Sequence, residues 1–429
     1  MRNFIFIFFT IIFINGCSTK TAQIVTSNSY NLKLDLKQDT KILPKLKKQE
    51  QLDGSVFMKR YFGVWNNTKP DTSKKDAFWA LNVYKNSKHR SYYGPNRSTY
   101  SDKFFKNIKE NSSIDEFGKI SKPAITLKNT FLRNAPSHEP IFKNFSHPSG
   151  GYPFDQFSNS TLGINYPLYV SHFSKNRDFA FVQNDTVWGW IDARDIKILN
   201  EFEINMFKNS NFITILDDRT PILDIEDNFL FYGRVGTILM NDSKDKRYYY
   251  GDVFTKNGLK RYKIKLKSAT TWPAQINDKH LKQIIEGILG EPYGWGGFEY
   301  YRDCSLFTKD FMSVFGIWLP RNSKAQASIY KTIDLKNKTN EEKLEIIKNH
   351  GEPYFSLVYM PGHIMLYTGV IKNEVSVAHN VWGLRTNNNG RALIAKMALT
   401  TLEIGKENKD IPNSNLLLSK ITKLVILSN

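Results

Sequence analysis

The sequence predicts an α+β protein made of several consecutive domains. With 429 residues, the chain is long enough for two to four domains, each with a hydrophobic core of its own. Its apolar residues recur at helical spacing near the start, alternate in short segments through the middle, and form a helix-then-strand pattern toward the end. Two cysteines are too few for a framework of disulfide bonds or for a cysteine-rich zinc site.

The N-terminus has the pattern of an export signal. A short cationic start precedes the apolar run Phe4 to Ile14, which is too short to span a bilayer and has the length of a cleaved signal. The run ends in Ile14-Asn15-Gly16-Cys17, which resembles the lipobox of bacterial lipoproteins. The resemblance implies that residues 1–16 are a signal peptide and that Cys17 carries a lipid. Alternatively, Cys17 is a small residue beside an ordinary cleavage site.

The net charge indicates which partners the protein binds, and Ser18 indicates in which membrane it is anchored. The chain has 60 Lys and Arg against 41 Asp and Glu, a formal net charge of +19. Such a charge favours nucleic acid, anionic lipid headgroups or a carboxylate-rich polymer, and export argues against nucleic acid. Ser18 stands where an inner-membrane retention signal usually has aspartate, so we expect an exported, lipid-anchored protein on the periplasmic face of the outer membrane.

Residues 17–122 are expected to form a polar tether and a small helical cap. The tether, residues 17–52, is polar and carries six lysines between Lys33 and Lys48, a composition that cannot bury enough surface to fold alone. The cap, residues 53–122, contains apolar residues at helical spacing in residues 56–62 and 78–84, with Pro70 between them.

Residues 123–277 are expected to form two small β-barrels. Short alternating segments, separated by turn residues, cover residues 123–205 and again residues 206–277. Each set has about the length of one small barrel, so two barrels fit better than one sandwich. Their role is open, because such barrels serve as binding modules or as spacers. The expected strands are 124–132, 166–173, 178–183 and 187–191 in the first set, and 214–216, 236–240 and 247–253 in the second.

The last domain, residues 278–429, carries the candidate chemistry. An amphipathic helix at residues 279–289 leads into the glycine-rich loop 293–297, and Cys304 then opens an apolar helix. A thiol in the first turn of a helix feels the positive end of the helix dipole, which stabilises the thiolate and lowers the pKa. Cys304 is therefore a candidate nucleophile. The alternative is an inert buried cysteine that packs as a small apolar side chain.

Two histidines on the following strands give Cys304 its chemical context. His363 begins an apolar strand, and His379 stands at the expected end of the next strand, Val375 to Ala378. A thiol nucleophile needs an imidazole as proton acceptor and a second polar group that orients this imidazole. Neighbouring antiparallel strands can supply both. Two histidines and one cysteine lack the close paired spacing of metal loops, so we expect neither a metal nor a cofactor.

Four motifs in order resemble the NlpC-type cell-wall cysteine peptidases, which have a circularly permuted papain-like fold. They are Tyr293-Gly-Trp-Gly-Gly, Asp303-Cys304-Ser305, the segment Gly316 to Gln326 with its Leu-Pro-Arg, and Gly362-His363-Ile up to Gly369. A helical cap before two SH3-like barrels resembles the multidomain branch of that family, the γ-D-glutamyl-diamino-acid peptidases. The fold class implied is a papain-like NlpC-type catalytic domain preceded by two SH3-like β-barrels and a helical N-terminal cap.

The resemblance implies a role for each motif residue. Cys304 would be the nucleophile, His363 the general base and His379 its orienting partner. The Tyr293 hydroxyl and the Cys304 backbone N–H would stabilise the oxyanion.

Three further residues would bind substrate by the same resemblance. Asp303 and Ser305 would hold the free amine of the first alanine of a stem peptide, with the help of Tyr293. As an alternative, Asp303 is a helix N-cap carboxylate. Asp155 lies in a loop of the first barrel that resembles a substrate-facing loop, and ordinary turn chemistry is its alternative.

The predicted function is hydrolysis of the γ-D-glutamyl to diamino-acid bond in peptidoglycan stem peptides or fragments, with a preference for a free N-terminal L-alanine. The membrane would be the second partner, through the lipid on Cys17. The alternatives are a related thiol acyltransferase or amidase, because the triad does not determine the acceptor, and a non-catalytic peptidoglycan-binding lipoprotein. The oligomeric state is left open.

Overall fold

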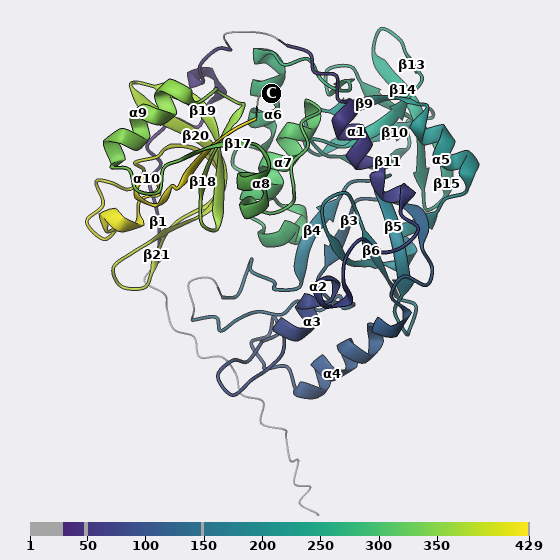
Figure 1. The fold of residues 1–429 in the computed structure, drawn as a ribbon. Helices are drawn as coiled ribbons and strands as arrows, with labels where there is room; N and C mark the ends of the chain where they lie inside the picture. The colour runs from purple at the N-terminus through teal and green to yellow at the C-terminus, as the bar shows by residue number, and fades with distance from the viewer. Residues whose placement is uncertain (1–28, 47–49, 147–149, 428–429) are drawn as a thin grey trace, which may run out of the picture.

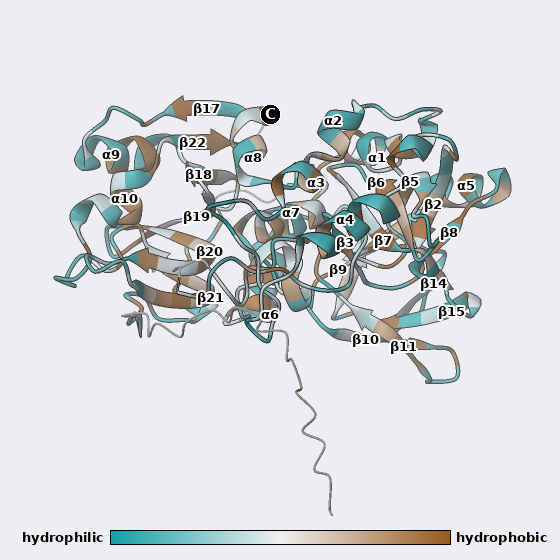
Figure 2. Ribbon diagram, turned by 90° about the horizontal axis from the view of Figure 1, so that it is seen from below, coloured by the Kyte–Doolittle hydropathy of each residue, from teal (hydrophilic) through white to brown (hydrophobic). Residues whose placement is uncertain are grey.

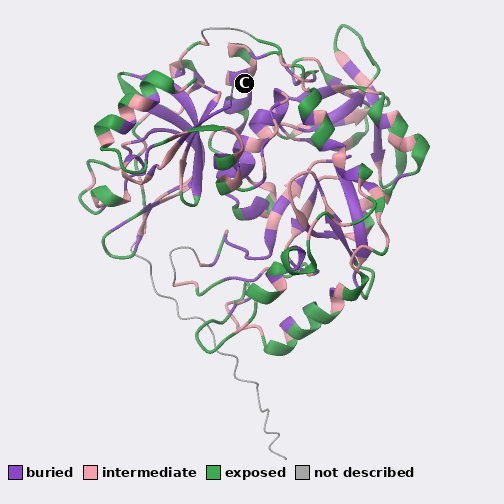
Figure 3. Ribbon diagram, viewed as in Figure 1, coloured by how far each residue is buried: buried purple, intermediate pink, exposed green. Residues whose placement is uncertain are grey.

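The structure is a computed structural model that describes residues 29–46, 50–146 and 150–427. Short helices form much of the N-terminal part of the protein. Helix α4 begins after Ser101, whose hydroxyl accepts a hydrogen bond from the Phe104 N–H, and it buries Phe105 and Ile108. Figure 3 shows the outer side of this helix as exposed. The helices are α1 (Ser55–Tyr61), α2 (Lys74–Ala77), α3 (Trp79–Val83) and α4 (Asp102–Asn111).

The first barrel is an antiparallel sheet in the strand order β4-β3-β7-β6-β5-β2-β8. Its core contains alternating strand residues such as Leu132, Val182 and Ile191. Two strands take the place of the single strand expected over residues 124–132, because the chain turns between them. The strands are β2 (Lys122–Thr126), β3 (Thr130–Arg133), β4 (Ser158–Leu162), β5 (Pro167–Phe173), β6 (Phe179–Gln183), β7 (Trp188–Asp192) and β8 (Ile196–Ile198).

The second barrel follows a short helix, α5 (Glu201–Lys208), which begins with a capping box between Asn200 and Glu203. It consists of a five-stranded sheet, β11-β10-β15-β14-β13, and a three-stranded sheet, β12-β9-β16. Helix α1 packs Phe57 and Tyr61 into a cluster that includes residues of both barrels. The strands are β9 (Asn211–Ile215), β10 (Thr220–Asp224), β11 (Phe229–Gly233), β12 (Ile238–Asn241), β13 (Ser243–Lys244), β14 (Tyr248–Thr255), β15 (Gly258–Lys265) and β16 (Ala269–Thr271).

The last domain is a seven-stranded sheet with helices on both faces (Figure 1). Its strand order is β1-β21-β20-β19-β18-β22-β17, and all neighbours except the β1–β21 pair are antiparallel. The elements are α6 (Asp278–Ile288), α7 (Cys304–Val314), α8 (Ser323–Ile329), β17 (Lys331–Asp334), α9 (Asn340–His350), β18 (Ser356–Met360), β19 (His363–Ile371), β20 (Glu374–Arg385), β21 (Arg391–Thr401), α10 (Leu417–Lys420) and β22 (Lys423–Ile426).

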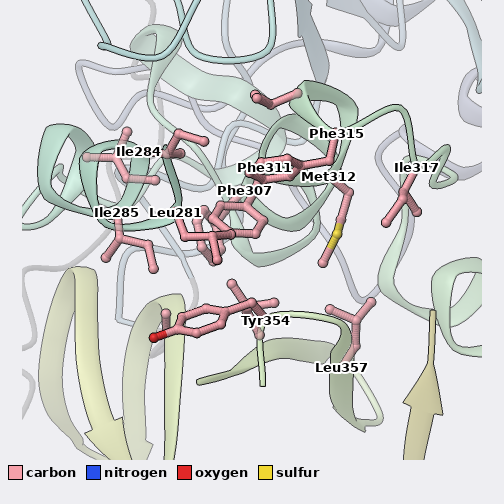
Figure 4. Close-up of a cluster of buried hydrophobic side chains, with 14 of the residues drawn as sticks. Leu281, Ile284, Ile285, Phe307, Phe311, Met312, Phe315, Ile317, Tyr354 and Leu357 are labelled. Carbon is pink, nitrogen blue, oxygen red and sulfur yellow. The ribbon is translucent and has the colours of Figure 1, made fainter. Parts of the chain in front are cut away.

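One of the two apolar clusters of this domain lies between helices α6 and α7 and one face of the sheet, and the other includes residues of α9 and α10. Figure 4 shows Ile284 of α6, Phe307 and Phe311 of α7 and Leu357 of β18 in one apolar cluster. In Figure 1, α7 lies between the sheet and the barrels. Figure 2 shows the same division, with the sheet at one side, the barrels at the other and apolar residues concentrated in the strands.

The expected tether is instead packed against the catalytic domain over its described part. Strand β1 (Tyr30–Asn31) pairs in parallel with β21, and Leu43 is buried in the core beneath α6 and α7. The Asp35 carboxylate accepts hydrogen bonds from the N–H and hydroxyl of Thr401. The polar composition did not indicate this packing, because leucines between the lysines pack against the last domain while Lys33, Lys37, Lys41 and Lys45 are exposed. Residues 17–28 lie outside the described residues.

Helices and sheets together confirm the α+β fold class, with the helical part first, the two barrels next and the mixed domain last. Within the described part of the chain, no helix is both long and apolar enough to span a membrane.

Candidate active site

Cys304 is the first residue of α7, and its side chain is buried. The helix starts here because the Asp303 carboxylate caps it, accepting the Leu306 N–H at 2.8 Å. The backbone N–H groups of Ile364 and Ser305 lie within hydrogen-bond reach of the sulfur. Since Ile364 directly follows His363, the thiol lies against the start of β19.

His363 and His379 come together on the neighbouring strands β19 and β20. His363 Nε2 and His379 Nδ1 are 2.8 Å apart, and His379 Nε2 lies 3.0 Å from Thr400 Oγ1 on β21. His363 uses Nε2 in this bond, which leaves Nδ1 as the ring nitrogen available to the thiol. Strand β20 continues to Arg385, so His379 lies inside the strand and not at its end as expected.

Among the described residues, neither imidazole forms a hydrogen bond with the Cys304 thiol. Catalytic hydrogen bonds in free enzymes are often long and tighten when substrate binds. The structure therefore places the thiol near the two histidines. The histidines are hydrogen-bonded to each other, and we expect the hydrogen bond between the thiol and His363 to form when substrate binds.

Burial is the main cause of the pKa shifts of Cys304, His363 and His379. It raises the pKa of the Cys304 thiol to about 12, the nearby Asp303 charge adds to the increase, and the N–H of Ile364, Arg321 and the N–H of Ser305 oppose it. This corrects the expectation of a lowered thiol pKa, because desolvation outweighs the helix dipole. Burial also lowers the pKa of His363 to about 4, and it lowers that of His379 well below its ordinary value. At neutral pH the pair is a neutral thiol beside a neutral imidazole.

Tyr293 lies in the glycine-rich loop, which is fixed to β21 by a hydrogen bond from the Tyr293 N–H to the Ala395 carbonyl. Burial raises the pKa of its phenol well above 10, and the negative charges of Cys304, once this thiol is ionised, and of Asp303 add to the increase. The hydroxyl therefore stays protonated and is close to both groups. A protonated, buried hydroxyl beside the nucleophile is suited to donate to an oxyanion.

Asp303 directs its carboxylate into the protein. Five hydrogen bonds reach it: from the N–H of Gly296, the hydroxyl of Ser305, the N–H of Leu306 and two nitrogens of Arg321 at 3.0 and 2.7 Å. Burial alone would raise the pKa of Asp303, but the Arg321 charge and these bonds hold it below its ordinary value.

The N-cap role considered for Asp303 is therefore present. The expected ion pair with a substrate amine would have to displace one of its bonds, because a carboxylate offers about four lone-pair sites. Ser305 has the same inward orientation, since its hydroxyl donates to Asp303 and accepts from Arg321.

Arg321 is a site residue that the sequence reasoning missed. Its Nε donates to the Ser160 hydroxyl of β4 at 2.9 Å, so the first barrel takes part in the network behind the nucleophile. The Leu-Pro-Arg motif was the available signal. The partner Ser160 is 161 residues away in the chain and has no local pattern that marks it.

Asp155 does not face the cleft, which corrects the expectation of a substrate-binding role. Its side chain is fully buried, pairs with Arg133 at 3.0 Å and accepts the N–H groups of Ile141 and Phe157. These bonds fold the long loop back onto β3. The neighbouring Phe154 instead lines the cleft.

The glycine-rich loop is a second contact between the catalytic domain and β4, beside the Arg321–Ser160 hydrogen bond. Gly296 and Gly297 have φ values of +61° and +84°, and a Cβ on either would come within 2.8 Å of the backbone at Ser158 or Thr161. Only glycine combines this conformation with so close an approach. The first barrel thus lies directly against the loop that carries Tyr293.

A cleft of about 620 Å³ runs along this site. Its lining includes Phe154 and Trp295, whose ring centroids are 5.7 Å apart, together with Tyr293, His363 and Arg385. Within the described residues, no group of His, Cys, Asp or Glu side chains is arranged to hold a metal ion. Cys17 lies outside the described residues.

A thiol at a helix N-terminus, set beside paired histidines on adjacent strands, is the site of a papain-like cysteine peptidase. The NlpC/P60 family profile matches residues 290–389, and the profile of the NLPC_P60 N-terminal stabilising domain matches residues 6–117. SH3 domains of the SH3b1 and SH3b2 types match residues 140–192 and 200–239. The chain therefore contains an NlpC/P60 domain at residues 290–389, and its two barrels match SH3 domains.

The fold is also similar to that of solved structures, and the first of them supports this assignment. An NlpC/P60 endopeptidase from Photobacterium damselae subsp. piscicida superposes with a TM-score of 0.81 at 25% sequence identity, over 93% of this chain and 99% of its own. An NlpC/P60 family protein from Bacillus cereus ATCC 10987 has a TM-score of 0.48 and 16% identity, over 71% of this chain and 99% of its own. No curated protein sequence matches the chain significantly.

Proposed function

We propose that the protein hydrolyses the amide bond between γ-D-glutamate and the diamino acid of peptidoglycan stem peptides. The observation that carries the proposal is the pairing of His363 and His379 at 2.8 Å beside the buried Cys304 thiol. The NlpC/P60 domain and the two SH3 matches support a cell-wall peptide as substrate.

The proposed mechanism starts from a neutral Cys304 thiol and a neutral His363 imidazole. The Cys304 sulfur attacks the γ-glutamyl carbonyl carbon while its proton passes to His363, because a thiol with a pKa of about 12 is not ionised beforehand. His363 then protonates the diamino-acid nitrogen as the C–N bond breaks and a thioester forms. Water, deprotonated by His363, hydrolyses the thioester. The Tyr293 hydroxyl and the Cys304 N–H stabilise both oxyanions.

A preference for a free N-terminal L-alanine is the second part of the proposal. The support for this preference is steric and not electrostatic. The Asp303 carboxylate already accepts hydrogen bonds from Arg321 and from a backbone N–H, so an ion pair with a substrate amine does not carry the argument. Phe154 of the first barrel packs against Tyr293, Trp295 and Trp382 with tilted or edge-on rings, and the proposal places this aromatic wall at the acyl end of the cleft. A short peptide ends before such a wall, whereas a sugar-linked stem continues into it.

Export and lipid anchoring at Cys17 belong to the same proposal and rest on the sequence of residues 1–17. Labelled palmitate should enter the wild-type protein. In Cys17→Ala both the label and the membrane association should be lost. Sedimentation of Cys17→Ala with membranes in high salt would refute the anchor.

The bond is tested by mass analysis of products from L-Ala-γ-D-Glu-diamino-acid peptides and from the matching sugar-linked stems. We expect L-Ala-γ-D-Glu and the C-terminal fragment, formed faster from the free peptide. Cys304→Ala should fold with an unchanged Tm and form no product, and Tyr293→Phe should lower kcat about 100-fold or more. Cleavage at another bond, or equal rates on both substrates, would contradict the corresponding part of the proposal.

A further inference from the structure

The hydrogen-bonded pair of histidines continues to a third buried side chain, Thr400 of β21. His363 Nε2 and His379 Nδ1 are 2.8 Å apart, and His379 Nε2 lies 3.0 Å from Thr400 Oγ1. His379 and Thr400 are fully buried, and His363 is 9% exposed. A buried N–H needs a hydrogen-bond acceptor, so the Thr400 hydroxyl affects where the protons of the two rings reside.

Each neutral imidazole carries one N–H, so this chain of hydrogen bonds has two possible directions. In the first, His363 Nε2–H donates to His379 Nδ1 and His379 Nε2–H donates to Thr400 Oγ1, which leaves His363 Nδ1 free to act as a base. In the second, every bond is reversed, and His363 carries its proton on Nδ1, where it cannot accept the thiol proton. The proposed reaction, on which this inference rests, requires the first direction.

Proton transfer makes the first direction obligatory. Once His363 has taken the proton of Cys304, both of its ring nitrogens are donors. His379 Nδ1 must then accept, its own proton must be on Nε2, and Thr400 Oγ1 is the acceptor that lies within reach. Burial lowers the pKa of His363 to about 4, so every hydrogen bond that supports its charged form matters for the barrier.

Two side chains near the N-terminus hold Thr400 in place by binding its neighbours along β21. Gln38 Oε1 accepts the Leu399 N–H at 2.9 Å, and Gln38 Nε2 donates to the Leu399 carbonyl at 2.7 Å, as a neighbouring strand would. The Asp35 carboxylate accepts the N–H and the hydroxyl of Thr401. The backbone of β21 is thus fixed on both sides of Thr400.

We infer that Thr400 is a positioning residue of the reaction: its hydroxyl oxygen accepts the His379 Nε2–H and so keeps His363 in the tautomer that can act as a base. Gln38 and Asp35 contribute by fixing the backbone at Thr400. The effect of Thr400 on the reaction passes through His379 and not through contact with the substrate.

The test compares Thr400→Val, which has nearly the same shape without the hydroxyl, with Thr400→Ser, which keeps the hydroxyl. In Thr400→Val we expect kcat on the L-Ala-γ-D-Glu-diamino-acid peptide to fall about 10- to 100-fold, the range known for outer hydrogen-bond partners of metal-binding histidines. KM should stay at the wild-type value, and Thr400→Ser should recover most of kcat. Gln38→Ala should lower kcat by a smaller factor, also without a change in KM.

NMR of protein with isotope-labelled histidine nitrogens measures the tautomers in the free enzyme, without substrate. In the wild type we expect the proton on Nε2 of both His363 and His379. In Thr400→Val we expect a shift toward protonated Nδ1, because an Nε2–H of His379 would have lost its acceptor. A purely structural role of Thr400 would change Tm and leave the tautomers as they are.

Thr368→Val is the matched control, because the Thr368 hydroxyl is buried in the same sheet and lies 2.8 Å from Ser376 Oγ. It should leave kcat and the tautomers at their wild-type state even if it lowers Tm. Wild-type kcat in Thr400→Val, or a Thr400→Ser protein of wild-type Tm that recovers no activity, would overturn the inference. Protonated Nδ1 on both histidines of the wild type would do the same, and wild-type kcat in Gln38→Ala would overturn the part of Gln38. If the wild type does not cut the peptide at the γ-glutamyl bond, the proposed function fails, while the tautomers still decide the role of Thr400.

Discussion

Arg302 Nη2 donates to Asp218 Oδ1 at 2.7 Å, an ion pair that joins the residue before Asp303 to the second barrel. Arg302 is fully buried and also binds Glu291 at 3.0 Å and Asp310 at 2.8 Å. Glu291 precedes the loop of Tyr293, and Asp310 belongs to α7. One guanidinium therefore fixes the second barrel, the tyrosine loop and the nucleophile helix relative to one another.

Replacing Arg302 should weaken both stability and catalysis. Arg302→Gln removes this cation from the buried carboxylates of Asp218 and Glu291, which keep only Arg234, and from the partly buried Asp310. Breaking a buried ion pair typically costs about 3–5 kcal/mol. We expect a free energy of unfolding lower by about this amount in urea titrations, and a reduced kcat because Cys304 and Tyr293 lose their common support. Arg261→Gln is the control, since Arg261 pairs with Asp242 at the surface, where such pairs contribute about 0–1 kcal/mol. Equal effects of the two substitutions would contradict the role of the network.

The same network predicts a loss of stability in acid. Burial alone would raise the pKa of Asp218, but Arg302 and Arg234 lower it to about 2, against 3.8 for an unperturbed aspartate. A lowered folded-state pKa adds stability that is complete above pH 4 and is lost as the pH falls through 2. One group with this shift contributes about 2 kcal/mol.

Unfolding by urea between pH 5 and 2 measures this contribution. In Asp218→Asn the decrease in stability over that range should be smaller than in the wild type by about 2 kcal/mol. A parallel pH dependence in both proteins would show that Asp218 does not titrate as expected.

The reactivity of Cys304 should rise steeply with pH. Because burial raises the thiol pKa to about 12, the rate of alkylation by iodoacetamide should increase up to pH 9 and beyond without a neutral plateau. The acid limb of kcat/KM should lie near pH 4, where His363 gains its proton and can no longer act as a base. Alkylation that reaches its plateau below pH 8.5 would instead show a preformed thiolate.

The sequence predicted what local spacing determines. The position of Cys304 at a helix start, of His363 at a strand start and the order of the four parts all follow from short patterns and motifs. The tertiary contacts of these residues could not be predicted from local patterns. Arg321 meets Asp303 and Ser160, and residues 30–46 meet β21, only through tertiary packing.

The pKa of the Cys304 thiol could not be predicted from the sequence for the same reason, its dependence on tertiary packing. The helix dipole is visible in a sequence, but the burial that outweighs it depends on the whole fold. Asp155 illustrates the point for a loop residue. A polar loop suggests a surface position, whereas Arg133 and two backbone donors draw this carboxylate inside.

The close approach of the glycine-rich loop to β4 gives the last prediction. A Cβ at Gly297 would lie 2.8 Å from the Thr161 nitrogen, so Gly297→Ala must push the first barrel away from the loop that carries Tyr293. We expect a lower Tm and a kcat reduced at least tenfold, because Phe154 and Tyr293 lose their relative position. Gly258→Ala is the control, since Gly258 has a similar φ of +88° but no atom within 4 Å of the added Cβ. It measures the conformational strain of alanine alone, about 1 kcal/mol. If Gly297→Ala lowers Tm and kcat no more than Gly258→Ala does, contact between the barrel and the loop is not what holds the site together.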